Sequence, residues 1–242
     1  MSDRAWRPEI FVMAADGSSV VRVTVHAGSP SRPSWAKDGE NIAFESTDPT
    51  SGNRELFSVS IRSGVIRKLT SGSCAPTVLR VCPNGNVAHR QPAFSPDGSR
   101  IAFVRTDRTG SHVFVVNADG SQARRIGGTN AANPAWAGDG RRLAYDDIDG
   151  IRVVNADGGD QHVVPGTSRA CLPTGARCPI FVEPSWSADG TRLAVREVTP
   201  GVSTGEIYVI DLHEQQQTRL NVGAMASNPK WYSPSPPPPV RP

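Results

Sequence analysis

The chain has 242 residues, 37% of them hydrophobic, and a formal net charge of +3 at pH 7. This composition supports a folded core rather than wholesale disorder, and the small, dispersed charge argues against a nucleic-acid-binding protein. No stretch approaches the ~20 apolar residues of a transmembrane helix, and the start, MSDRAWRPEI, has no apolar signal core. We therefore expect no membrane span, and any export signal is absent from this chain. The 23 glycines and 21 prolines favour many short strands joined by turns.

The first predicted elements are two strands joined by a turn, in EIFVMAADGSSVVRVT (9–24). A phrase then follows that recurs along the chain, and each copy predicts a strand, an Asp-Gly turn and a second strand. Its copies are RPSWAKDGENIAF (32–44), QPAFSPDGSRIAF (91–103), NPAWAGDGRRLAY (133–145), EPSWSADGTRLAV (183–195) and the partial copy NPKWYSP (228–234). A third strand follows each complete copy, as in LFSVS (56–60), and a further turn leads to a fourth.

One aromatic residue occupies the same place in every copy of the phrase. These residues are Trp35, Phe94, Trp136, Trp186 and Trp231. A large aromatic side chain at a fixed place in a repeat is typical of a packing position, so we expect all five to lie in the core.

Four consecutive antiparallel strands in each unit are typical of a propeller blade. The chain enters the repeat at a third strand and leaves it after a first strand. The sequence therefore predicts an all-β fold, a single β-propeller of about five four-stranded blades, with one blade divided between the N- and C-termini. In that blade we expect residues 230–232 to form the innermost strand beside strands 10–13 and 20–24. A six-bladed or incomplete ring is the alternative.

The phrase P-x-[WF]-S-x-D-G-x-x-[IL]-A-[FY], followed by a strand and N-A-D-G, resembles the WD-like repeats of TolB-type β-propellers. The resemblance covers about residues 9–232, so we expect one propeller domain over residues 1–232. It implies a binding module and names no catalytic residue. The remaining residues, 233–242, form a proline-rich tail or linker with polyproline II character.

The four cysteines form two local pairs, each inside one long connection. Cys74 and Cys82 form the first pair, and Cys171 and Cys178 the second. Such pairs predict two disulfides and hence a periplasmic or extracellular location. Unpaired thiols and a zinc site are the alternatives, although neither pair has the C-x-x-C spacing typical of zinc.

Acidic residues are the better candidate metal ligands. Asp146, Asp147 and Asp149 follow the second strand of one unit, and Glu45 and Glu197 lie at nearly the same point of two others. Carboxylates that converge at a ring mouth could bind calcium, and a solvated rim is the alternative. No other cofactor is expected.

The long connections, residues 46–53, 71–91, 166–183 and 199–205, should all lie on one face of the propeller. Loops on a rigid scaffold often carry binding sites, so this face is the candidate surface for a protein or cell-envelope ligand. The expected molecule is a monomer that binds a protein partner and catalyses no reaction. The alternative is an enzyme, a lyase or hydrolase of a sugar or lactone, that acts at the mouth of the channel.

Overall fold

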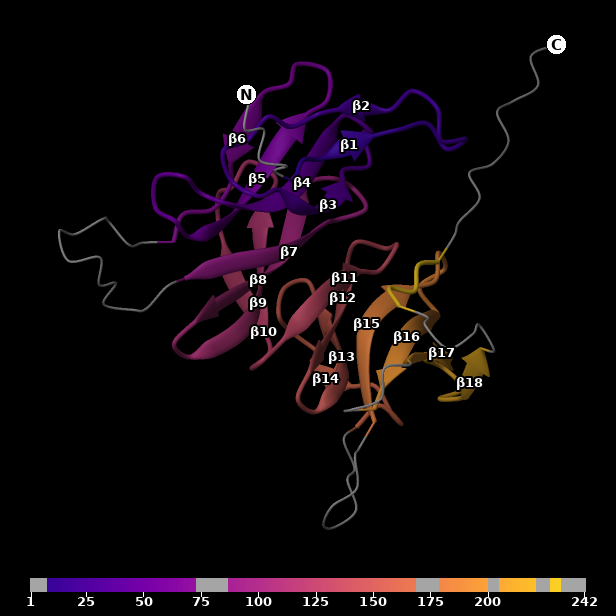
Figure 1. The fold of residues 1–242 in the computed structure, drawn as a ribbon. Coiled ribbons are helices and arrows are strands. Elements are labelled where there is room, and N and C mark those ends of the chain that lie inside the picture. The colour runs from indigo at the N-terminus through magenta and orange to yellow at the C-terminus, as the bar shows by residue number, and fades with distance from the viewer. Residues whose placement is uncertain (1–7, 73–86, 169–178, 200–204, 221–226, 232–242) are drawn as a thin grey trace.

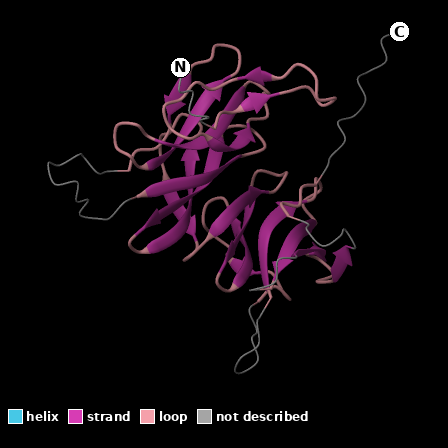
Figure 2. Ribbon diagram, viewed as in Figure 1, coloured by secondary structure: helices cyan, strands magenta, loops and turns pink. Residues whose placement is uncertain are grey.

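A computed structural model describes residues 8–72, 87–168, 179–199, 205–220 and 227–231 (Figure 1). These residues form strands, turns and loops, with no helix among them (Figure 2). The described residues accordingly contain no helix that is long and apolar enough to cross a membrane. The tail, 233–242, and all four cysteines lie outside the described residues, so the disulfide pairing stays a prediction.

Four sheets have four antiparallel strands each, and every strand pairs with its neighbour in the chain. The first sheet contains β3 (Ser31–Trp35), β4 (Asn41–Thr47), β5 (Arg54–Ser60) and β6 (Ile66–Lys68). The second contains β7 (Ala88–Phe94), β8 (Arg100–Asp107), β9 (Gly110–Asn117) and β10 (Arg124–Gly127). The third contains β11 (Ala132–Trp136), β12 (Arg142–Asp147), β13 (Gly150–Asn155) and β14 (His162–Val163). The fourth contains β15 (Ile180–Trp186), β16 (Arg192–Val198), β17 (Gly205–Asp211) and β18 (Gln217–Leu220).

Consecutive sheets pack face to face, which is the arrangement of propeller blades. One apolar layer, which includes Leu56 and Phe103, joins the first and second sheets. Equivalent layers join the second sheet to the third and the third to the fourth. The first strands of the four sheets contact one another in succession, β3 to β7, β7 to β11 and β11 to β15, so they form the inner wall of the arc (Figure 1). The predicted all-β propeller with four-stranded blades is confirmed.

The two segments predicted to form the divided blade each pack on a neighbouring complete blade. The outer segment is a two-stranded sheet of β1 (Phe11–Val12) and β2 (Val21–Arg22), which packs on the first blade through Ile10 and Phe44. The inner segment is 227–231, which packs beside β15: the Trp231 backbone N–H lies 3.4 Å from Ser185 Oγ. Within the described ranges this segment belongs to no strand, and β1 pairs only with β2. Closure of the ring by strand pairing therefore stays a prediction.

The repeated aromatic position is a core position in only part of the ring. Trp136 and Trp186 are 9% and 6% exposed, and Phe94 and Trp231 are partly buried. Trp35 is 46% exposed, so the prediction that all five aromatic residues are buried is wrong for Trp35. The physical reason is the divided blade before it, which among the described residues supplies no second strand to cover the indole ring.

Candidate functional site: the central cavity

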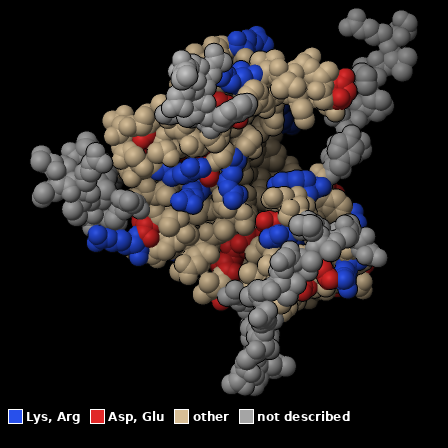
Figure 3. Space-filling model, viewed as in Figure 1, with Lys and Arg blue, Asp and Glu red and all other residues tan. Residues whose placement is uncertain are grey.

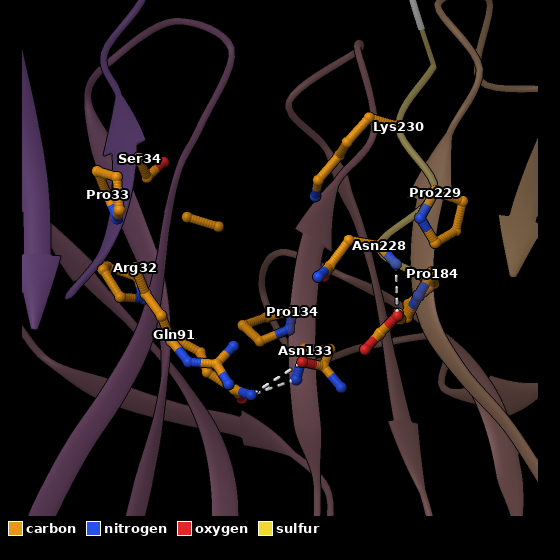
Figure 4. A pocket seen from close by; sticks show the side chains of 13 residues that line it. Arg32, Pro33, Ser34, Gln91, Asn133, Pro134, Pro184, Asn228, Pro229 and Lys230 are labelled. Carbon is orange, nitrogen blue, oxygen red and sulfur yellow. Dashed lines mark hydrogen bonds between the residues drawn. The ribbon is translucent and has the colours of Figure 1, made fainter. Parts of the chain in front are cut away.

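The inner segments of all five repeats line one central cavity of about 350 Å³ (Figure 4). Each repeat contributes a residue-proline pair at the same place. The pairs are Arg32-Pro33, Gln91-Pro92, Asn133-Pro134, Glu183-Pro184 and Asn228-Pro229. The partial fifth repeat therefore aligns with the other four as the sequence predicts, because Asn228, Pro229 and Lys230 lie where those repeats have their inner strand.

A backbone irregularity aims the residue before each proline into this cavity. Arg32, Gln91, Asn133, Glu183 and Asn228 all have φ between 50° and 57°, in the left-handed region. The register of each inner strand shifts at this point, as between Ser31 and Ser34 in β3, which is the sign of a β-bulge. Left-handed backbone is uncommon for residues other than glycine. Because it recurs in every repeat, we infer that the geometry of the blade requires it at this position.

The same irregularity frees a backbone N–H, which bonds to the preceding repeat. Four such bonds follow one another around the cavity, from Gln91 N to Glu45 Oε2 (2.7 Å), Asn133 N to Gln91 Oε1 (2.9 Å), Glu183 N to Asp146 Oδ1 (3.0 Å) and Asn228 N to Glu183 Oε2 (2.8 Å). The described repeats are thus joined by a relay of hydrogen bonds as well as by apolar layers. This relay fixes the positions of the side chains that line the cavity.

The residue that accepts this hydrogen bond alternates between two positions of the repeat, and the sequence explains the alternation. Glu45 and Asp146 occupy the same place in the second strands of the first and third blades, opposite Ser31 and Ala132. In the second and fourth blades the corresponding residues are Val104 and Arg196, which cannot accept a hydrogen bond. There the residue before the proline, Gln91 or Glu183, is itself the acceptor.

Two cations, Arg32 and Lys230, line the cavity. Arg32 is exposed, and its Nε lies 3.8 Å from the nearest carboxylate oxygen, that of Glu45, which Arg54 already contacts at 3.0 Å. No hydrogen bond or ion pair is found for the Lys230 ammonium among the described residues, and it points into the cavity (Figure 4). On the face in Figure 3, Lys and Arg side chains lie on both sides of a hollow near β7 and the described C-terminal segment.

Asp146, one of the acceptors that join the repeats, has a raised pKa. Its pKa is raised to about 6, chiefly by burial and to a smaller extent by the neighbouring Glu183 carboxylate, against hydrogen bonds from Asn133 and Glu183 that lower it. Its Oδ1 accepts both the Asn133 amide N–H (2.9 Å) and the Glu183 N–H. The folded protein therefore favours the neutral acid more than the unfolded chain does.

We expect Asp146→Asn to become progressively more favourable, relative to the unchanged protein, as pH rises from 4 to 8. The folded-state pKa lies above the ordinary value of 3.8, so the stability from the neutral carboxyl is complete below pH 4 and is lost as pH rises through about 6. Two pKa units correspond to about 3 kcal/mol, and asparagine keeps an Oδ1 for both hydrogen bonds. Denaturant melts at pH 4 and pH 8 measure this; an effect of Asp146→Asn that does not change with pH would show that Asp146 titrates normally.

The other acidic candidates do not converge with Asp146. Asp147 and Asp149 both pair with Arg152, away from the cavity lining. Glu197 lies one position further along its strand than Glu45 and Asp146 do, opposite Glu206, and so faces the other side of the sheet. The described residues include no group of three or more His, Cys, Asp or Glu that could hold a metal ion. Glu197 thus lies near the position of Glu45 in the repeat, as predicted, but one residue away and facing the other side of the sheet, and Asp146 is the counterpart of Glu45.

The residues before the prolines were not predicted as site residues from the sequence. A signal was present, because a polar residue precedes the proline in all five copies of the phrase. It went unused because a residue before proline normally adopts extended backbone, which gives no reason to expect a bulge there.

The fold and the cavity together define this protein as a β-propeller of the TolB type. Residues 64–227 match the family model of the lipoprotein LpqB β-propeller domain, and the chain belongs to this family. Among curated proteins, a TolB homolog of Chlorobium luteolum is 27% identical over 153 residues, which cover 51% of this chain and 35% of that protein. The uncharacterized peptidase YuxL of Bacillus subtilis is 27% identical over 137 residues, which cover 55% of this chain and 18% of that protein.

Solved structures support the same fold. TolB of Acinetobacter baumannii superimposes with a TM-score of 0.63 at 18% identity, over 87% of this chain and 48% of that one. A puromycin-hydrolyzing peptidase of Mycobacterium tuberculosis gives 0.57 at 13% identity, over 86% of this chain and 31% of that one. The chain thus spans about half or less of the length of these relatives.

Proposed function

We propose that this propeller is a non-catalytic binding module of the cell envelope, which holds a protein partner over the central cavity. The observation that carries the proposal is the cavity itself: polar side chains from five repeats line it, and two of them are cations, Lys230 and the exposed Arg32, whose nearest carboxylate is 3.8 Å away. Exposed charges and amides on a preorganised scaffold are suited to recognition, because little order is lost on binding. Location in the envelope is supported by the family, whose described member is a lipoprotein, and by the two predicted disulfides.

The proposed contact face is the one that carries the long connections. In each blade the Asp-Gly turn between the first and second strands lies at one end, and the link between the second and third strands lies at the other. Pro49 and Thr50 are exposed in the described link between β4 and β5, at the end where the chain also passes from one blade to the next. A partner segment that carries carboxylates would fit between Arg32 and Lys230.

An enzyme of a sugar or lactone has less support at this site. Glu183 is the only carboxylate among the described residues that line the cavity. It already accepts the Asn228 N–H and lies 3.3 Å from Arg196 Nε. General acid–base catalysis uses a group that is free to exchange a proton with the substrate.

Site-specific photo-crosslinking in the native cell envelope tests the proposal. A photoreactive residue at Thr50 is expected to yield a discrete protein adduct, whereas one at Ala188, in the Asp-Gly turn at the opposite end, is expected to yield little. The double change Arg32→Glu with Lys230→Glu should reduce the Thr50 adduct at least tenfold. The matched control, Lys37→Glu with Arg141→Glu, makes the same change of charge on exposed turn residues and should leave it intact. Equal adducts from Thr50 and Ala188 would refute the assignment of the face.

A further inference from the structure

An arginine side chain is stacked on an aromatic ring at three successive blade interfaces. The arginine is always two residues after the turn glycine, and the ring is the repeated aromatic residue of the next repeat. The distances from Cζ to the ring centroid are 4.9 Å for Arg100 on Trp136, 4.9 Å for Arg142 on Trp186 and 5.2 Å for Arg192 on Trp231. Cation–π contacts of this kind are favourable, and this one recurs at equivalent positions between successive blades.

Hydrogen bonds define the rest of the guanidinium site. Arg142 donates to the carbonyl oxygen of Gly190, the turn glycine of the next blade, at 3.0 Å. It also donates from Nε to Oδ2 of Asp139, its own turn aspartate, at 2.9 Å. Arg100 makes the same bond to the turn glycine of its neighbour, Gly140, at 2.8 Å. At its interface the Arg142 guanidinium therefore contacts three receptor groups: an aromatic face, a glycine carbonyl and a carboxylate.

The first interface has the receptor groups but no arginine. Asn41 stands where the other blades have arginine, and Phe94 where they have tryptophan. The Asn41 amide bonds to Asp38 Oδ2 at 2.7 Å and does not extend to the next blade, and no described donor reaches the carbonyl oxygen of Gly98. A cavity of about 460 Å³ results, lined by Asp38, Asn41, Phe94 and Gly98 among others.

The charges around this cavity favour a cation. Asp38 and Asp119 both line it, and Arg67 is the only cation among its lining residues. Backbone N–H bonding from Glu40 lowers the pKa of Asp38, and the Ser121 side chain lowers the pKa of Asp119. Both carboxylates are thus ionised at neutral pH and exceed the positive charge by one.

We propose that this cavity between the first and second blades, which we call the interblade notch, binds a guanidinium group from an arginine side chain of another polypeptide. The guanidinium stacks on Phe94, donates to the Gly98 carbonyl and pairs with Asp38, as Arg142 does with Trp186, Gly190 and Asp139 within the chain. Its volume lies in the range of small-ligand sites, so it has room for the alkyl stem as well. The notch lies at the Asp-Gly turns and is independent of the surface proposed above for the protein partner.

Titration of the isotopically labelled protein with N-acetyl-arginine methylamide, followed by NMR, tests this inference. We expect saturable shifts of the Gly98 and Asp119 amides, with Gly140 and Asp157 unmoved because Arg100 already occupies the corresponding place. The lysine analogue should bind at least fivefold more weakly, and the uncharged citrulline analogue should give no saturable shift. Shifts that do not saturate, or that are equal for arginine and citrulline, would overturn the proposal. Tighter binding of free arginine than of the blocked form would overturn the assignment to a polypeptide side chain.

Three variants separate the notch from general effects on folding. Asn41→Arg with Phe94→Trp rebuilds the internal stack, and it should raise the melting temperature and abolish binding of the probe. Asp119→Asn keeps the acceptor for Ser121 N–H and should weaken binding severalfold at unchanged stability. Arg67→Gln should strengthen binding severalfold. Unchanged affinity in both Asp119→Asn and Arg67→Gln would contradict the site even if the double variant failed to fold.

Discussion

Replacement of Trp136 by alanine is expected to lower the free energy of unfolding by about 3–5 kcal/mol, the usual cost of emptying an aromatic core site. The indole is 9% exposed and packs in the apolar layer between the second and third blades. Its Nε1 donates to the Ala93 carbonyl oxygen at 3.0 Å, and Arg100 covers its face. The substitution therefore removes apolar burial, a hydrogen bond and a cation–π contact together. Equilibrium denaturation in urea measures the loss.

Trp35→Ala is the matched control, because the same residue type occupies the same place in the phrase. Trp35 is 46% exposed, so its removal should cost about 1 kcal/mol or less. Equal losses for the two tryptophans would show that the ring is closed over Trp35 in solution and that its exposure is not a property of the folded protein.

Glu55→Ala is expected to cost about 3–5 kcal/mol, because it leaves buried donors without their acceptor. The Glu55 carboxylate is fully buried and accepts hydrogen bonds from the Thr70 hydroxyl (2.6 Å) and the Gly72 N–H (2.5 Å). His89 Nδ1 lies 2.7 Å away, on the first strand of the next blade. These groups join the third strand of the first blade, and the connection that follows its outer strand, to the first strand of the second blade, so the loss should affect the whole domain.

The dependence on pH distinguishes this buried carboxylate from an ordinary packing residue. Burial raises the pKa of Glu55, but the hydrogen bonds from His89, Thr70 and Gly72 outweigh it and hold the pKa below 4.5. The stability that Glu55 contributes is thus present above about pH 4.5 and is lost as pH falls through its lower folded-state pKa. The cost of Glu55→Ala should shrink in acid, whereas Glu40→Ala, which removes an exposed partner of Arg62, should cost little at any pH. A pH-independent cost for Glu55→Ala would contradict the assigned network.

The repeat phrase was sufficient to predict the blades, because each of its residues has a structural role that depends on its local sequence. Proline starts an inner strand, Asp-Gly makes the turn, and the aromatic residue packs against the next blade. Trp35 was predicted wrongly because burial depends on the neighbouring blade, and the divided blade supplies less cover than a complete one. Local sequence carries no information on that neighbour.

The site was harder to predict than the fold. Glu45 and Asp146 were recognised as acidic residues near the ring, but their role as acceptors for the next repeat's bulge depends on a left-handed backbone at Gln91 and Glu183. The interblade notch required comparison of whole interfaces, since the change from arginine to Asn41 has meaning only beside Phe94 of the next repeat. Both features arise from contacts between blades, which a single repeat does not contain.

A ring of five repeats around the cavity requires residues 228–231 as the inner segment of the divided blade. Thermal unfolding of two shortened chains tests this requirement: one ends at residue 232 and lacks only the proline-rich tail, and the other ends at residue 226. We expect the chain that ends at 232 to unfold like the full chain, and the chain that ends at 226 to melt at a lower temperature across the whole domain. If both shortened chains melted at the same temperature and with the same cooperativity, residues 228–231 would have no place in the ring.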